Sequence, residues 1–299
     1  MNYLVTGGTG FIGQQLVKEL IKSGNTVTVV SRQPHKVAKL LGQQVHAVSP
    51  DDIKELDANI DVVVNLAGAP IVDKRWSEHR KALLRDSRIA FTEQLINDLE
   101  SIGAQPNCFI SGSAIGFYGS HSGGSPLDEQ GSVAPGFTHD LCRDWENAAQ
   151  NAQTKLGSRV CTLRTGVVVG PNGGALKKMI TPFKLGLGGP IGHGLQWMSW
   201  VHLDDEVAAI QFLVAHDTLQ GPFNLTAPGA VTNETFSHAL GRAVNRPAKL
   251  RMPAVVMELM LGEASELLTQ GQRVFPARLL EAGFTFKYPE LKEALAASV

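Results

Sequence analysis

Short β-branched runs alternate with longer amphipathic stretches over residues 1–170, the pattern of a parallel sheet covered by helices on both faces. The β-branched runs predict strands at Tyr3–Thr6, Thr26–Ser31, Val45–Val48, Val62–Leu66, Cys108–Ser111 and Val160–Arg164. Apolar residues spaced at helical intervals predict helices at Ile12–Ser23, Trp76–Ile102 and Thr138–Lys155. The valine run at 62–64 has no in-out alternation, as in a strand buried on both faces. We therefore predict an α/β fold class with a Rossmann-like, doubly wound parallel sheet.

The composition of the chain changes after Gly166. Residues 171–194 are rich in glycine and proline, which favours loops that shape a cleft over regular elements. Helices are expected at Asn233–Asn245 and Pro253–Gly271, and the FTFKY segment at 284–288 predicts a strand before a short amphipathic helix. We expect a cofactor-binding domain over 1–170, with 195–225 returning to it, and a smaller C-terminal α+β domain on the substrate side over 171–299.

The sharpest chemical signal is the sequence TGGTGFIG at 6–13, directly after the first predicted strand and at the start of the first helix. Gly7 and Gly10 allow a tight turn and bring backbone N–H groups close to a diphosphate, while Gly13 lets the helix pack against the strand. The amino end of this helix, at Phe11 and Ile12, adds a partial positive charge. We predict dinucleotide binding here, with a purely structural turn as the alternative.

The second predicted strand ends at Ser31 and Arg32, where an NAD-binding site commonly places an acidic residue for the ribose 2′-hydroxyl. No acidic residue is present at this point of the sequence. Arg32 can instead hold a 2′-phosphate through its fork of N–H donors, with Ser31 as a second contact. This favours NADP(H) as the cofactor, and an exposed loop arginine is the alternative.

Small residues follow the fourth predicted strand, where the chain reads Asn65-Leu66-Ala67-Gly68. At this point the backbone of Leu66, Ala67 and Gly68 can pass under the adenosine and its ribose. A strand end without a ligand would contain the same residues.

The composition limits the classes of function. Of the 299 residues, 43% are apolar and 18% charged, which suits a globular protein and excludes a disordered or fibrous one. Lys and Arg total 27 against 28 Asp and Glu, so the net charge of −1 offers no overall field to nucleic acid or an anionic membrane. No apolar run has the roughly 20 residues of a membrane helix, no charged leader precedes the first strand, and the three cysteines form no CxxC pair. We expect a cytoplasmic monomer or homodimer that acts on a small molecule.

Several segments together resemble the extended short-chain dehydrogenase/reductase superfamily. They are TGGTGFIG, NLAG, SGSA at 111–114 leading to FYG at 117–119, LRTGVVVGP at 163–171, WVHLDD at 200–205 and GPFNLTAP at 221–228. The chain is most similar to the epimerase family proteins, an atypical group with a small C-terminal domain of unknown function, on DLCRDWE at 140–146, FKLGLGGPIGHG at 183–194 and GQRVFPARLLEAGFTFKYPEL from 271. The likeness covers essentially the whole chain.

The resemblance implies a Rossmann fold, a nicotinamide dinucleotide and further cofactor contacts. Val168 of LRTGVVVGP is one such contact. Arg88 is another, at the place where the superfamily usually carries an asparagine, on the helix after NLAG. A cation there can reach cofactor phosphates or an anionic substrate, and a surface arginine is the alternative.

The resemblance also implies a catalytic tyrosine with a lysine four residues later that lowers the tyrosine pKa, but this chain lacks the pair. Anchored on Glu146, the superfamily pattern places the two residues at Thr138 and Cys142. Tyr288 and Lys292 have the right spacing but lie in the C-terminal tail, so we treat that match as chance.

Other residues are candidates for the chemistry. Ser113 keeps the place of the hydroxyl that would hydrogen-bond a substrate carbonyl, with capping of the strand end as the alternative. Tyr118 is a candidate proton donor or a packed aromatic residue. His139 and Arg143 are weaker candidates, because an arginine among acidic neighbours is typical of a solvated ion pair.

No metal site is expected, because the sequence has no HExxH or HxH pattern, and we interpret His193 and His202 as core or loop-capping histidines. Trp197, Met198 and Trp200 are expected to line the pocket or its floor.

The sequence therefore favours an NADP(H)-binding oxidoreductase or epimerase-type enzyme that transfers hydride to or from an unidentified carbonyl or sugar-nucleotide-like substrate. One alternative is a non-catalytic NADP(H)-binding module, such as a redox sensor, because the tyrosine and lysine are missing. Another is an NAD-linked dehydratase or epimerase with a rearranged acid and base.

Overall fold

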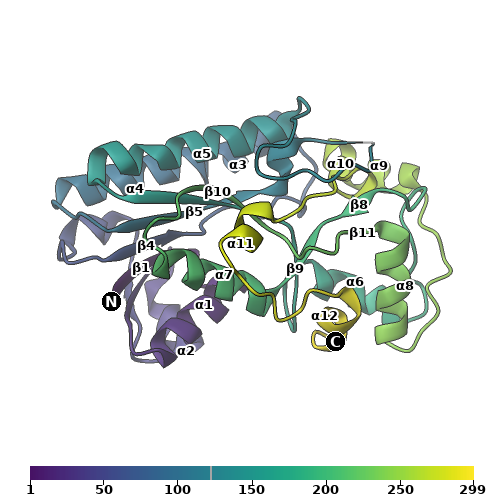
Figure 1. Cartoon of the computed structure of the whole chain (residues 1–299), viewed down its shortest axis with the longest axis horizontal. Coiled ribbons are helices and arrows are strands. Elements are labelled where there is room, and N and C mark those ends of the chain that lie inside the picture. The colour runs from purple at the N-terminus through teal and green to yellow at the C-terminus, as the bar shows by residue number, and fades with distance from the viewer. Residues whose placement is uncertain (122) are drawn as a thin grey trace.

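A seven-stranded parallel sheet forms the centre of the computed structural model, which describes residues 1–121 and 123–299 (Figure 1). Its strands are β1 (Asn2–Thr6), β2 (Thr26–Val30), β3 (His46–Val48), β4 (Val62–Asn65), β5 (Cys108–Ala114), β6 (Arg159–Thr165) and β10 (Gly221–Leu225). They lie in the order β10-β6-β5-β4-β1-β2-β3, and every neighbouring pair is parallel. This order confirms the predicted Rossmann-like α/β fold.

Helices cover both faces of the sheet. One face carries α1 (Phe11–Lys22), α2 (Val37–Leu41) and α7 (Leu203–Ala215), and the other carries α3 (Glu78–Asp86), α4 (Ile89–Ser101) and α5 (Phe137–Leu156) (Figure 1). Val62 and Val64 pack in the core under α1 and α7, whereas Val63 packs in the core under α4 and α5. Burial on both faces explains why these three valines show no alternation.

The order of the strands reverses between β1 and β4, which are neighbours near the middle of the sheet. From β1 the chain proceeds to β2 and β3 on one side, and from β4 to β5 and β6 on the other. The carboxyl ends of β1 and β4 therefore border a crevice, where open α/β sheets bind their ligands. The glycine motif follows β1 and NLAG follows β4, so the topology brings both predicted binding segments to this crevice.

The C-terminal part of the chain forms a smaller α+β unit, on the right of Figure 1. Its elements are β7 (Val167–Val169), α6 (Gly174–Lys184), β8 (Trp197–Met198), β9 (Trp200–His202), β11 (Val231–Thr232), α8 (Asn233–Ala243), α9 (Ala254–Leu261), α10 (Glu266–Thr269) and α12 (Leu291–Ala296). The helix α11 (Ala277–Glu281) instead packs beside β10, and its Leu279 is buried in the core under α1 and α7. β7 pairs with β9 in parallel, and β8 pairs with β11 in the antiparallel sense. Trp200, Phe236, Leu240 and Leu295 lie in a separate apolar core that holds this unit together.

Two predicted helices are divided in the structure. The Trp76–Ile102 stretch forms α3 and α4, because the Ser87 hydroxyl donates to the carbonyl of Leu84 and side-chain bonds of this kind compete with helical backbone bonds. The Pro253–Gly271 stretch is divided at Gly262, whose φ of 58° ends α9 in the left-handed region. Short 3₁₀ helices lie at Pro34–Lys36, Asp51–Glu55, Ile115–Tyr118 and Gly262–Ser265.

Two other expectations for this half of the chain were wrong. Residues 171–194 contain α6, because Leu176 and Phe183 are buried on one helical face and this periodicity outweighs the glycines and prolines around it. The FTFKY segment is not a strand, although Phe284 and Phe286 are buried in the core beside α7. The side chains of this segment alternate in burial as they would in a strand. The segment is irregular because it pairs with no neighbouring strand among the described residues. The short helix expected after it is α12.

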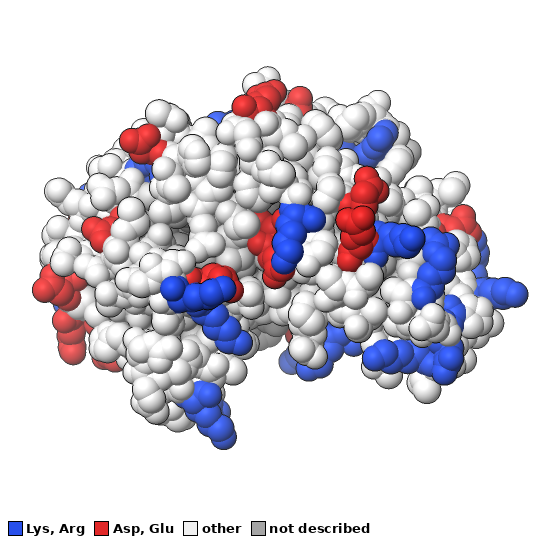
Figure 2. Space-filling model, turned by 60° about the horizontal axis from the view of Figure 1, so that its bottom comes forward, with Lys and Arg blue, Asp and Glu red and all other residues white. Residues whose placement is uncertain are grey.

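The surface carries charges of both signs. Figure 2 shows acidic and basic side chains interspersed over one face, with basic ones more frequent towards the end formed by the C-terminal unit. Within the part of the chain that the structure describes, no helix combines the length and the apolar character that a bilayer crossing requires.

Candidate cofactor site

The loop after β1 lies in direct contact with the backbone around it. Gly7 has a φ of 67°, and a Cβ atom on it would lie 2.6 Å from the carbonyl carbon of Leu66. A Cβ atom on Gly13 would lie 2.3 Å from the carbonyl oxygen of Gly7, which also accepts a hydrogen bond from the Gly10 N–H at 2.8 Å. Only glycine fits at positions 7 and 13, because any side chain there would collide with backbone.

The amino end of α1 opens onto this loop. Phe11 begins the helix, and no side chain caps its amino end. The N–H groups of the first turn are therefore available to an anion, and the helix dipole favours negative charge there. Ile12 packs against the main core, and the Phe11 ring lies so close to the loop before α6 that a Cβ atom on Gly173 would lie 2.1 Å from it. This end of α1 is thus held by packing and leaves its backbone donors free.

Buried polar side chains fix the NLAG turn beside the glycine loop. The Thr6 hydroxyl donates to Asn65 Oδ1 at 2.6 Å and accepts from the Ala67 N–H at 3.2 Å. The Asn65 amide donates in turn to the Thr92 hydroxyl on α4 at 2.8 Å. Thr6, Asn65 and Thr92 are completely buried, so these bonds form in a low dielectric and hold the turn in one position. Sequence reasoning did not identify Thr92, whose position at the middle of a helix gives no local signal.

Arg88 lies under the NLAG turn and does not extend into solvent. Its Nη2 donates to the Ala69 carbonyl at 2.9 Å, and its guanidinium carbon lies 5.2 Å from the centre of the Trp145 ring. A Cβ atom on Gly68 would lie 3.0 Å from that carbon, so the turn rests on the guanidinium plane. Burial lowers the pKa of Arg88, which remains charged because the ordinary value for arginine is so high. The structure therefore places this cation under the NLAG turn, and its contact with a cofactor stays a prediction.

Ser31 and Arg32 lie at the carboxyl end of β2, which is the neighbour of β1 on the side of the crevice away from β5. The Ser31 hydroxyl accepts a hydrogen bond from the Gln33 N–H at 3.1 Å. The Arg32 side chain is exposed and forms no hydrogen bond or ion pair among residues 1–121 and 123–299. Its donors are therefore free to bind an exposed phosphate.

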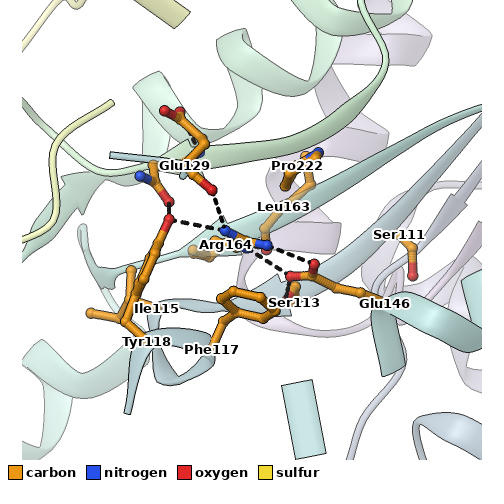
Figure 3. Close-up of polar contacts among 12 residues, drawn as sticks. Ser111, Ser113, Ile115, Phe117, Tyr118, Glu129, Glu146, Leu163, Arg164 and Pro222 are labelled. Carbon is orange, nitrogen blue, oxygen red and sulfur yellow. Dashed lines mark hydrogen bonds and ion pairs between the residues drawn. The ribbon is translucent and has the colours of Figure 1, made fainter. Parts of the chain in front are cut away.

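Ser113 belongs to a buried polar network between the sheet and α5, shown in Figure 3. Its hydroxyl donates to Glu146 Oε1 at 2.7 Å, and Arg164 reaches the same carboxylate from β6 with Nε to Oε1 and Nη2 to Oε2, both at 2.9 Å. Because the single proton of Ser113 is donated to Glu146, its oxygen can accept a hydrogen bond but not donate one to a substrate carbonyl. The sequence suggested no link between Ser113 and Arg164.

Tyr118 is part of the same network. Its hydroxyl donates to Asn224 Oδ1 at 2.7 Å and accepts from Arg164 Nη1 at 3.1 Å (Figure 3). The side chain is fully buried, and this burial raises its pKa to about 12. A proton donor has to reach the substrate, and this hydroxyl is both occupied and enclosed. The placement argues against the proton-donor role and favours the packed aromatic residue.

The positions expected for the missing tyrosine and lysine carry groups that cannot replace them. Thr138 and Cys142 lie on the face of α5 toward Gly116, where a Cβ atom would be 3.2 Å from Thr138 Cβ and 3.5 Å from Cys142 Sγ. Burial raises the pKa of the Cys142 thiol to about 12, so it is neutral. Tyr288 lies in the C-terminal tail, with its ring centre 4.1 Å from that of His202. The Tyr288–Lys292 spacing is therefore unrelated to this site.

The remaining candidates lie in ordinary structural surroundings. His139 Nδ1 is 2.5 Å from the Phe117 carbonyl, and Arg143 pairs with Asp140 and Asp144 on the surface of α5. His193 Nδ1 accepts from the Leu195 N–H in its own loop. Among the described residues, no group of three or more metal-ligating side chains is gathered together.

An acidic residue that the sequence did not single out lies at the same edge of the sheet. Glu206, on α7, accepts a hydrogen bond from the Thr165 hydroxyl at the end of β6, at 2.8 Å. Glu206 is completely buried, and burial raises its pKa to about 8. One sequence signal could have identified Glu206. It is an acidic residue in the apolar helix LDDEVAAIQFLVA, on the side where Val207 and Ile210 are buried.

The fold and the crevice define an α/β protein built for a dinucleotide, and comparisons with known proteins specify its family. A model of the NAD dependent epimerase/dehydratase family matches residues 3–226, and a domain of unknown function, DUF1731, matches residues 252–298. The chain belongs to the NAD dependent epimerase/dehydratase family.

Curated relatives and solved structures agree with this assignment. The chain is 42% identical to the epimerase family protein Mb2239 of Mycobacterium bovis over 97% of this chain and 95% of that protein. It is 36% identical to the epimerase family protein SAR0825 of Staphylococcus aureus over 98% and 97%. The crystal structure of the human epimerase family protein SDR39U1 with NADPH is similar with a TM-score of 0.89 and 33% identity, covering 99% of this chain and 98% of that one. The UDP-glucose 4-epimerase of Thermotoga maritima shares the fold at 21% identity and a TM-score of 0.82, covering 100% and 97%.

We predict that Gly13→Ala weakens the binding of ADP, which carries the diphosphate, by at least about tenfold. The added methyl group would displace the Gly7 carbonyl and with it the whole loop. Gly24→Ala is the control. Gly24 also has a positive φ, 79°, but a Cβ atom on it would have no other atom within 4 Å. This substitution should therefore lower the unfolding free energy by about 1–2 kcal/mol without changing the affinity for ADP. Calorimetric titration measures the affinities and thermal unfolding the stability, and a folded Gly13→Ala variant with unchanged affinity would contradict the account.

Replacing Glu146 should destabilise the fold strongly. Glu146→Gln leaves the buried Arg164 guanidinium without its counter-charge, which we expect to cost about 3–5 kcal/mol of unfolding free energy.

Tyr118→Phe removes one hydroxyl from the same network and should cost about 1–3 kcal/mol of unfolding free energy. Urea denaturation provides the comparison, and a Glu146→Gln variant as stable as the wild type would show that the network contributes nothing.

Proposed function

We propose that this protein is an NADP(H)-dependent oxidoreductase or epimerase-type enzyme that transfers hydride to or from a carbonyl or sugar-nucleotide-like small molecule. The observation that carries the proposal is the backbone contact of Gly7 and Gly13 at the crevice between β1 and β4, beside the uncapped end of α1. A bound nicotinamide dinucleotide supplies the hydride chemistry, and the protein supplies orientation and a path for protons.

The choice of NADP(H) over NAD(H) depends on the end of β2. Arg32 is exposed with free donors and Ser31 is beside it, and no acidic residue lies between 31 and 36 to hold a free 2′-hydroxyl. The crystal structure of the human relative contains NADPH, which supports this preference. Solved epimerases below 25% identity contain NAD, as the UDP-glucose 4-epimerase of Thermus thermophilus does, so the fold alone does not decide between the two cofactors.

The chain's own residues then have defined roles. Gly7, Gly10 and Gly13, together with the amino end of α1, would hold the diphosphate, while Arg88 supports the NLAG turn below it. Ser113 would accept a hydrogen bond from a substrate hydroxyl, because its proton is already donated to Glu146. Val168 would contact the cofactor from the strand after β6.

A non-catalytic NADP(H)-binding module is the second candidate. One observation favours it: Thr138 and the neutral Cys142 thiol stand where a catalytic tyrosine and lysine would be. Such a module binds the cofactor at the same crevice but catalyses no hydride transfer.

Arg32→Ala should reduce the affinity for NADPH by about tenfold or more and leave the affinity for NADH unchanged, because only NADPH carries the 2′-phosphate. Lys39→Ala, an exposed lysine on α2, is the control and should change neither affinity. Titration of the nucleotide fluorescence measures the dissociation constants of NADPH and NADH for both variants. Equal loss for both nucleotides, or no loss for NADPH, would overturn the assignment of Arg32.

Hydride transfer is tested with NADPH deuterated at C4 and a panel of aldehydes, ketones and sugar nucleotides. We expect deuterium in the product of at least one compound, detected by mass spectrometry, with turnover lowered by Ser113→Ala at unchanged NADPH affinity. An epimerase-type reaction returns the substrate's own hydride, so each sugar nucleotide is also incubated with the NADP⁺-loaded protein. Tight binding of NADPH with neither deuterium in any compound nor epimerisation of any sugar nucleotide would favour the non-catalytic module.

A further inference from the structure

A buried acid and the hydroxyl of a half-buried threonine form a pair at the carboxyl end of β6. Thr165 is the last residue of this strand and is half-buried, and its Oγ1 donates to Glu206 Oε1 at 2.8 Å. Glu206 has no exposed surface, and among the described residues its Oε2 has no hydrogen-bond partner. The hydroxyl of Thr165 is therefore the group through which this carboxyl contacts the edge of the sheet.

Burial determines the ionisation of Glu206. Transfer of a carboxylate from water into a protein core is costly, so burial raises the pKa of Glu206 to about 8, and the hydrogen bond from Thr165 opposes this rise. Near neutral pH the carboxyl is thus mostly protonated, and a modest change in nearby charge can remove its proton.

The other charged groups around α7 are engaged with one another. Asp204 pairs with the Lys287 ammonium at 2.9 Å, and Asp205 accepts from the backbone N–H groups of Lys287 and Tyr288. The His202 ring packs on that of Tyr288. The remaining groups on the segments packed against α7 are Lys18, Glu19 and Lys22 of α1, Cys108 of β5, and Arg159 and Cys161 of β6. Arg159 and Cys161 bond to the carbonyl of Leu219 beyond the far end of α7, and Glu19 pairs with Lys22 on the surface.

The topology places this pair at the nicotinamide half of the cofactor, an inference that depends on the proposed function. The diphosphate would lie at β1 and the adenine-side ribose at β2, so the other half of a dinucleotide extends over β4, β5 and β6. Thr165 ends β6, and the backbone continues through Gly166 to Val168, an expected cofactor contact.

We propose that Glu206, acting through Thr165, is the proton-exchanging group of the site, neutral while the cofactor is reduced and ionised when it is oxidised. The charges balance in this scheme. A bound nicotinamide would supply the hydride for the new C–H bond of a reduced carbonyl, and its ring would then carry one positive charge. For this step a protonated Glu206 donates to Thr165 Oγ1, the reverse of the hydrogen bond in the structure, and the Thr165 proton is then free for the substrate oxygen. The substrate oxygen takes that proton, and Thr165 takes the proton of Glu206. The carboxylate that remains offsets the new positive charge and, being buried, is reprotonated through the Thr165 hydroxyl.

The sign of the expected pH dependence follows from this coupling. NADP⁺ has a positively charged ring and NADPH does not, so an ionised Glu206 favours NADP⁺ and a neutral Glu206 does not. As pH rises through about 8, the carboxyl ionises, and the ratio of the NADP⁺ dissociation constant to that of NADPH falls. Titration of the 2′-phosphate affects both nucleotides alike and cancels in the ratio.

The experiment measures both dissociation constants by calorimetry from about pH 6.5 to about pH 9.5. For the wild type we expect the ratio to fall by roughly fivefold or more, and for Glu206→Gln we expect it to stay flat. Thr165→Val removes the hydrogen bond that favours the carboxylate, so the fall should move to higher pH. Glu93→Gln, an exposed acid on α4, is the matched control and should behave as the wild type.

Proton counting keeps the test decisive if Glu206→Gln does not fold. Near pH 8, NADP⁺ binding to the wild type should release more protons than NADPH binding, measured in two buffers of different ionisation enthalpy. A flat wild-type ratio with equal proton release, or the same pH dependence in a folded Glu206→Gln variant, would overturn the role of Glu206 while leaving the cofactor site intact. Failure of both nucleotides to bind would instead reject the proposed function and this inference with it.

Discussion

The loop after β1 touches the backbone after β4, and the geometry of the candidate site depends on this contact. Gly7 lies against Leu66, and Gly13 lies against Gly7 itself, at distances that leave no room for a side chain. The buried bonds among Thr6, Asn65 and Thr92 hold the second of these segments in place, so the crevice between β1 and β4 is rigid before any ligand arrives. A preorganised backbone surface of this kind binds a diphosphate without the cost of ordering a loop.

The region where the superfamily places its catalytic pair has a different construction. Glu146, Arg164 and Ser113 form a closed set of charge-assisted hydrogen bonds, and Tyr118 extends it toward β10. Such a network is costly to break and resists rearrangement, which suits a structural role. Under the proposed function, acid–base chemistry comes from elsewhere along the same sheet edge, where we propose the Thr165–Glu206 pair.

Local patterns were sufficient to predict six of the seven strands, the fold class and the glycine motif, because each depends on residues close in sequence, but the edge strand β10 was not predicted. The failures have physical causes. The bond from the Ser87 hydroxyl to the Leu84 carbonyl divides the helical pattern between α3 and α4, and the buried periodicity of α6 outweighs its glycines and prolines. The partners of Glu206 and Thr92 could not be predicted, because the contacts join segments 41 and 27 residues apart; for Glu206 the acid within an apolar helix was the one local signal. The predicted roles of Ser31, Arg32 and Val168 stay predictions.

Phosphorus NMR of NADPH tests the central claim most directly, since it reports on the two phosphate groups separately. On addition of the protein, the account predicts that the diphosphate signals and the 2′-phosphate signal both shift and broaden together, because the loop after β1 holds one group and the end of β2 holds the other. Diphosphate signals that remain those of the free nucleotide at saturating protein would contradict it, whatever the 2′-phosphate signal does.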